Sequence, residues 1–306
     1  MPVESLLSIL FFFLVGIALR RFGLAGGAEA AFLFRLILYV TLPALVFLAV
    51  SGATLSRELV LLPLTGLAIN LVCMSAALVY ARAASLPPRT AGVLVLGATV
   101  TNGVFHFAFV FSALGQEALA QSILVDLGNA VFVATFAYSA AGWFGRSHGA
   151  SVGSSLLKTL RSPLFIALAA ALVFALGGLR PPVIVERVLS PLGATSIPLT
   201  IVALGISFSN VTLRDPLPVR TVLLRMPVGF AAGLLLVWLF GFTGTTATVV
   251  LVAAAAPIGF TTVTLASVAN LDTDRAVAAL SISVAVGLIS TPLILWLARG
   301  WLATGP

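Results

Sequence analysis

The chain has 306 residues, of which 60% are hydrophobic and only 8% are charged, and its formal net charge is +7. A soluble domain of this composition would expose more apolar surface than water tolerates. The apolar residues form runs of about 20, long enough for a membrane-spanning helix, and not the shorter alternating strands of a barrel. These features predict an all-α polytopic membrane protein and argue against a β-barrel.

Ten apolar runs are long enough to cross a hydrocarbon core of about 30 Å. In chain order the spans are predicted at residues 4–20, 28–51, 58–81, 90–114, 117–143, 160–178, 184–209, 218–242, 246–269 and 274–299. The one long polar connection divides the chain into a first five-helix repeat (1–145), a cytoplasmic linker (146–159) and a second repeat (160–306).

The basic residues indicate the orientation of these spans. They lie between the apolar runs without interleaved aromatic clusters, which argues against nucleic-acid binding. Most fall on one side of the predicted membrane: Arg20, Arg21, Arg82, Arg89, Arg146, Lys158, Arg161, Arg214, Arg220, Arg225 and Arg275. The positive-inside rule makes this side cytoplasmic, so both termini are predicted on the outer face.

Two pairs of helix-disrupting sites share one sequence offset. Pro43 and Pro198 are 155 residues apart, and so are Asn102 and Pro257. Because each half has an odd number of spans, two similar halves must be inverted relative to each other. The pattern predicts two inverted repeats with broken crossing helices 4 and 9, which is typical of secondary transporters. Pro43 and Pro198 are predicted to shape a scaffold around the site.

Broken helices near the midplane leave free N–H groups and a positive helix dipole, which favour an anion. The alternative is a purely structural role, in which Pro257 kinks the helix and Gly259 permits close packing. The predicted substrate-binding residues are Asn102, Gly103, His106, Pro257, Gly259, Thr261 and Thr262. His106 could instead relay protons, or be a neutral histidine that hydrogen-bonds across helices.

Asp126 is the one acidic residue deep within a predicted span, nine residues past Glu117 and hence about 13 Å inside. An intramembrane carboxylate is a candidate proton or cation site, and Asn129 shares its helical face. A structural alternative is a hydrogen-bonded Asp that stabilises the bundle. Asn70 is interpreted as an interhelical hydrogen-bonder.

Several segments resemble the auxin efflux carrier family, whose fold is similar to that of the bile acid:sodium symporter superfamily. They are LPALVFLAV in the second span, TNG in the fourth, and APIGFTTVTLASVANLD followed by ISVAVGLISTPLIL. The resemblance implies five plus five inverted spans, outside termini, an anionic substrate at the crossing of spans four and nine, and an elevator-like cycle. The short central loop looks bacterial, which implies an inner-membrane location.

The fourth span departs from the family pattern in two places. Thr101 occupies the position of a proline, and Phe107-Ala108-Phe109 replaces a later Gly-x-Pro. A less sharply broken first crossover is therefore expected.

The resulting hypothesis is a secondary carrier of a small organic anion, coupled to a proton or sodium ion, with no cofactor or metal and no enzymatic activity. A homodimer is left open. The alternatives are a drug/metabolite-type exporter, whose termini would face the cytoplasm, and a non-transporting receptor. An intramembrane enzyme using His106 and Asp126 is disfavoured, because HExxH and nucleotide-binding motifs are absent from the sequence.

Overall fold

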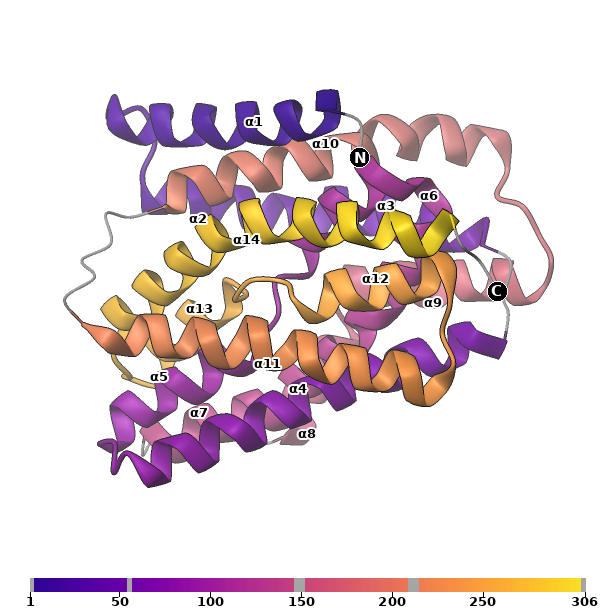
Figure 1. Cartoon of the computed structure of the whole chain (residues 1–306). Coiled ribbons are helices and arrows are strands. Elements are labelled where there is room, and N and C mark those ends of the chain that lie inside the picture. Colours follow the sequence, from indigo (N-terminus) through magenta and orange to yellow (C-terminus); the bar gives the residue numbers. More distant parts are fainter. Residues whose placement is uncertain (1–2, 54–56, 146–151, 209–214, 304–306) are drawn as a thin grey trace.

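The computed structural model describes residues 3–53, 57–145, 152–208 and 215–303, which form helices throughout (Figure 1). Each predicted span coincides with one helix or with a series of consecutive helices. The elements are α1 (Val3–Arg21), α2 (Gly27–Leu36), the π-helical turn η1 (Ile37–Thr41), α3 (Leu42–Ser51), α4 (Arg57–Ala83), α5 (Pro88–Thr99), α6 (Gly103–Phe132), the π-helical turn η2 (Val133–Ala137), α7 (Tyr138–Gly145), α8 (Val152–Leu160), α9 (Pro163–Leu176), α10 (Val183–Ser207), α11 (Pro216–Phe240), α12 (Gly244–Ala254), α13 (Thr261–Val268) and α14 (Thr273–Ala303).

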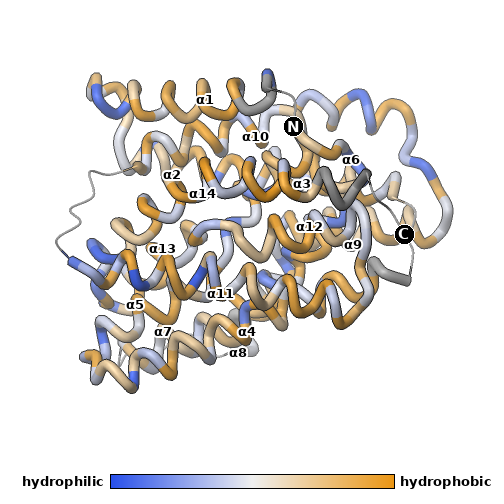
Figure 2. The backbone as a smooth tube through the Cα atoms, in the orientation of Figure 1, coloured by the Kyte–Doolittle hydropathy of each residue, from blue (hydrophilic) through white to orange (hydrophobic). Residues whose placement is uncertain are grey.

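Six stretches of the described residues are long and apolar enough to cross a membrane. They are Gly27–Ser51, Val60–Ala83, Gly103–Gly145, Val183–Ser207, Pro216–Phe240 and Thr273–Ala298. Most of their length is coloured as hydrophobic in Figure 2. The chain is therefore a helical membrane protein with several spans, and ten crossings remain a prediction.

The stretch 103–145 turns at Gly115, where the backbone leaves the helical conformation with φ of 84°. A positive φ of this kind suits glycine, which has no Cβ to clash. Gly115 lies between the predicted spans 90–114 and 117–143, so the expected boundary falls where α6 is interrupted.

The predicted linker 146–159 is partly helical in the structure. Residues 146–151 lie outside the described part, while α8 begins at Val152. One face of this helix carries Leu156, Leu157 and Leu160, which is an amphipathic pattern. The polar residues between and around these leucines make the pattern hard to recognise in the sequence.

The two halves of the chain pack in reciprocal pairs. Helix α1 of the first half packs along α10 of the second half (Figure 1), and α9 of the second half packs along α3 of the first. Within each half a matching pair also forms, because α4 packs on α5 and α11 packs on α12. At the centre, Ser196 in α10 donates a hydrogen bond of 2.8 Å to the hydroxyl of Thr41, and both side chains are buried. These residues are 155 positions apart, which is the offset between the two pairs of helix-disrupting sites in the sequence.

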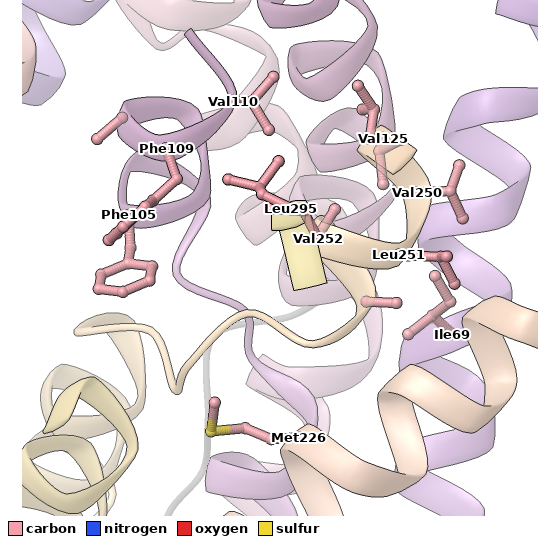
Figure 3. Close-up of a cluster of buried hydrophobic side chains, with 14 of the residues drawn as sticks. Ile69, Phe105, Phe109, Val110, Val125, Met226, Val250, Leu251, Val252 and Leu295 are labelled. Carbon is pink, nitrogen blue, oxygen red and sulfur yellow. The ribbon is translucent and has the colours of Figure 1, made fainter. Parts of the chain in front are cut away.

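The main core lies beside the interrupted helices. Figure 3 shows Phe105 and Phe109 of α6 near Val252 of α12 and Leu295 of α14, all of which belong to one buried cluster. The backbones of α4 and α6 approach closely at Gly128. A Cβ at this position would lie only 2.0 Å from the carbonyl oxygen of Pro63. Small residues of this kind permit close helix packing in membranes.

A cluster of polar side chains connects one end of α5, α11 and α14. Arg275 of α14 lies 2.6 Å from the carboxylate of Asp215 and 3.1 Å from that of Asp272, and it donates to the Thr90 hydroxyl of α5. Asp215 also caps α11 by accepting from the N–H of Leu217. Burial raises the pKa of Asp215, but this hydrogen bond and the Arg275 guanidinium outweigh it, and the pKa lies below its usual value.

Candidate substrate site at the crossing of two interrupted helices

The first interruption separates α5 from α6. Helix α5 ends at Thr99, Val100 is extended with φ of −78° and ψ of 118°, and α6 begins at Gly103. The break is complete, so the expectation of a less sharply broken first crossover is wrong. Side chains provide the physical reason: Asn102 accepts a hydrogen bond from the N–H of Phe105, and Asn129 accepts one from the N–H of Thr101, both at 3.2 Å.

The second interruption separates α12 from α13. Helix α12 ends at Ala254 and α13 begins at Thr261. Pro257 lies in the gap and cannot donate a backbone hydrogen bond. The N–H of Ile258 donates to the hydroxyl of Ser283 at 3.0 Å, so a side chain again replaces a helical partner.

The two interrupted segments cross and bond to each other. The N–H of Asn102 donates to the carbonyl of Pro257 at 2.9 Å, and the N–H of Gly259 donates to the carbonyl of Val100 at 2.8 Å. They pass beside the core cluster (Figure 3). A Cβ on Gly259 would lie 2.6 Å from the Thr101 carbonyl oxygen, so this contact depends on glycine. Backbone groups that the helices leave unpaired are thereby satisfied.

A cavity of about 440 Å³ adjoins the crossing. Its lining combines residues of the crossing helices with residues of η1, α3, α9 and α10. This volume is in the range of small-molecule sites. The crossing contributes the following lining residues: Thr101, Asn102, Gly103, Asp126, Asn129 and Thr261.

Asp126 belongs to a polar network that spans the crossing. Its carboxylate accepts a hydrogen bond of 2.9 Å from Asn129, whose own oxygen accepts one of 3.0 Å from Asn70. The Thr101 hydroxyl donates to Asn70 at 3.2 Å. The carboxylate also lies against the first residue of α6, since a Cβ on Gly103 would meet it at 2.6 Å. A carboxyl group therefore already stands at the positive end of α6.

The other predicted substrate residues lie behind the cavity and not in its lining. His106 is 1% exposed; its Nδ1 is 2.7 Å from the hydroxyl of Ser122, and its Nε2 is 3.9 Å from the carboxylate of Asp126. Pro257 and Gly259 form the crossing itself. Buried Thr262 donates to the carbonyl of Leu96 at 3.4 Å. The structure thus brings Asn102, Gly103, Thr261, Asp126 and Asn129 to one surface.

Sequence reasoning missed Arg225, which it counted among the cytoplasmic basic residues. The structure places Arg225 inside the protein with 0% exposure, nine residues into α11 and hence about 13 Å from the helix start. Its Nη2 donates to the Thr101 hydroxyl at 2.7 Å. A signal was available: Arg225 lies 155 residues after Asn70, which flanks the same Thr101 from α4.

Crossed, interrupted helices beside a cavity that polar residues line in part are typical of secondary membrane transporters. Residues 145–295 match the model of the family described as membrane transport protein. An uncharacterized transporter of Methanothermobacter thermautotrophicus is 27% identical over 298 residues, covering 95% of this chain and 96% of the relative. One from Methanocaldococcus jannaschii is 24% identical over 313 residues, covering 98% of each. This match and the two relatives support the membrane transport protein family, in agreement with the resemblance to the auxin efflux carrier family. The likeness to bile acid:sodium symporters remains a prediction.

Proposed function

We propose that the protein is a secondary transporter of a small organic anion. The observation that carries this proposal is that the N-terminal ends of α6 and α13 both reach one cavity, through Gly103 and Thr261. Each such end carries a partial positive charge. The N–H groups of Phe105, Thr262 and Val263 already donate to Asn102, Gly259 and Phe260, which leaves those of Gly103 and Thr261 as the candidate donors. A carboxylate placed between them would be bound by backbone donors from both halves of the chain.

Asn102 supplies a side-chain donor at the same place. Its oxygen caps α6, while its Nδ2 is buried and has no hydrogen-bond partner among the described residues. A buried donor without a partner is costly, and a substrate carboxylate would satisfy it. Thr261, at the start of α13, adds a hydroxyl in the cavity lining.

Asp126 links anion binding to protonation. An anion at the start of α6 would stand beside this carboxylate, and two like charges at such a separation repel strongly. Protonation of Asp126 removes that repulsion, so the anion and a proton bind together. Other titratable or charged side chains near Asp126 are His106 on α6, Arg225 on α11, Cys73 on α4, and Tyr39 and Tyr138 at the cavity wall.

The reciprocal packing supports alternating access through two inverted five-helix repeats. The cavity is lined by the crossing helices and by a second group of helices that includes α3, α9 and α10. Movement of one group against the other would carry the site across the membrane, as in an elevator. The start of α1 and the end of α14 lie toward the same side of the molecule (Figure 1), which fits an even number of crossings. The cytoplasmic membrane is the expected location.

The proposal is tested with purified protein and a panel of small carboxylates. We expect at least one carboxylate to raise the thermal midpoint, and the same compound to accumulate in proteoliposomes when a proton gradient is imposed. Binding without accumulation would indicate a receptor, and a panel without any thermal response would contradict an anion site.

Asp126→Asn tests the coupling. Because the amide carries no charge, we expect carboxylate binding to become independent of pH, whereas in the unaltered protein it strengthens as pH falls. Glu117→Gln, on the same helix and away from this cavity, is the matched control and should keep the pH dependence. An unchanged pH dependence in Asp126→Asn would make Asp126 a structural residue.

A further inference from the structure

Arg225 is a buried cation without an anionic partner. Its side chain is 0% exposed, and within the described residues it forms no salt bridge. Its Nε has no hydrogen-bond partner there either. An ionised group buried in this way is costly unless something compensates its charge, and inside a membrane span it marks a functional position.

The groups around the guanidinium come from the ends of the first half-helices. Nη2 contacts the Thr101 hydroxyl at 2.7 Å and the carbonyl of Ala253 at 3.5 Å. Ala253 is the penultimate residue of α12, and Thr101 lies two residues after the end of α5. The C-terminal end of a helix carries partial negative charge and unpaired carbonyls. The guanidinium therefore lies where the crossing attracts a cation.

The lack of a side chain at Gly229 leaves room for the guanidinium of Arg225. A Cβ on Gly229, one turn along α11, would lie 2.9 Å from Nη1 of Arg225. Nη1 also contacts the thiol of Cys73 on α4 at 3.5 Å. The equivalent position of the first half is the neutral Asn70, so only one of these two equivalent positions carries a charge. Thr101 accepts from Arg225 and donates to Asn70, which connects the cation to the network of Asp126.

In carriers with discontinuous helices, the C-terminal ends of half-helices and unwound carbonyls coordinate the coupling sodium ion or proton. We propose that Arg225 is a tethered cation that takes the place of a bound sodium ion at the crossing. This inference rests on the proposed anion transport, and it narrows the coupling ion to a proton and the substrate to a monovalent carboxylate.

The charges of the site support this assignment. In the empty site the carboxylate of Asp126 and the guanidinium of Arg225 sum to zero. When a monovalent anion binds together with a proton on Asp126, the anion and Arg225 again sum to zero. Both the empty and the loaded site are neutral, so each can move through the membrane without carrying net charge. A sodium ion added to either state would break this balance.

The experiment measures the response of the thermal midpoint to sodium, with choline as the substitute cation and without any carboxylate. We expect the unaltered protein to show no difference between the two salts. Arg225→Gln removes the cation and should gain a rise of about 2–4 °C in sodium, as binding at several times Kd produces. Arg225→Lys keeps the charge and should remain insensitive.

Sodium-dependent stabilisation of the unaltered protein would overturn the inference, as would a folded Arg225→Gln that ignores sodium. If Arg225→Gln folds only in sodium, the inference is supported. If Arg225→Gln folds in neither salt, the test rests on the unaltered protein and on Arg225→Lys, and a sodium-dependent midpoint in either of them would overturn the inference. Since no carboxylate is present, this result is separate from whether the protein binds an organic anion.

Discussion

Replacement of Asn102 separates its two roles. The side-chain oxygen caps α6 by accepting from Phe105 N–H, and the Nδ2 group is the unpartnered donor beside the cavity. Asn102→Asp keeps a capping oxygen but replaces the donor with a negatively charged acceptor. Asn102→Ala removes both. The pair of variants therefore distinguishes loss of helix capping from loss of anion binding.

The magnitudes follow from these two contacts. Loss of an N-cap costs about 1 kcal/mol of stability, and Asp caps about as well as Asn. A hydrogen bond to a charged group contributes about 1.5–3 kcal/mol, which corresponds to roughly a 10- to 150-fold change in Kd. We expect Asn102→Asp to raise the Kd for the carboxylate at least about 10-fold. The same variant should destabilise the protein less than Asn102→Ala does.

The assay is equilibrium binding of the carboxylate that gives the largest thermal shift, together with the thermal midpoint of each ligand-free variant. Asn70→Asp is a control for added negative charge near the crossing, because Asn70 does not line the main cavity. Carboxylate binding by Asn102→Asp that equals binding by the unaltered protein would refute the assignment of Asn102 to the site.

Two further predictions concern stability. Gly259→Ala places a Cβ 2.6 Å from the Thr101 carbonyl oxygen and should lower the free energy of unfolding by about 1–3 kcal/mol. Gly27→Ala has open space around it and should be neutral or stabilising in the same thermal measurement. Equal thermal midpoints for the two variants would contradict a tight crossing. Because the pKa of Asp215 is lowered in the folded state, its hydrogen bond from the N–H of Leu217 and its ion pair with Arg275 add stability at neutral pH that is lost as pH falls below about 4. Asp215→Asn should therefore flatten the acid side of the thermal midpoint against pH, and an unchanged profile would show that this pair contributes nothing.

Local sequence signals predicted the position of both crossing segments. Pro257 removes a backbone donor, and the offset of 155 residues placed Asn102 opposite it. The hydrogen bond between these two residues joins the predicted pair directly. The polar residues Asp126 and Asn129 could be found because carboxylates and amides are rare inside apolar spans.

The missed features depend on contacts between elements remote in sequence. Arg225 resembles a topology signal until Thr101 and Ala253 are brought beside it by the crossing. The first break needs no proline because Asn129, from the far half of α6, accepts the N–H of Thr101. His106 shares a helical face with Asn102 in sequence, but burial against Ser122 places it behind the cavity.

The most direct test of the account is an experimental structure with a brominated analogue of the bound carboxylate, located by the anomalous signal of bromine. The account predicts that signal in the cavity between Asn102 and Thr261, at the N-terminal ends of α6 and α13. A signal confined to the cavities beside Arg82 and Trp143 or beside Arg180 would contradict it.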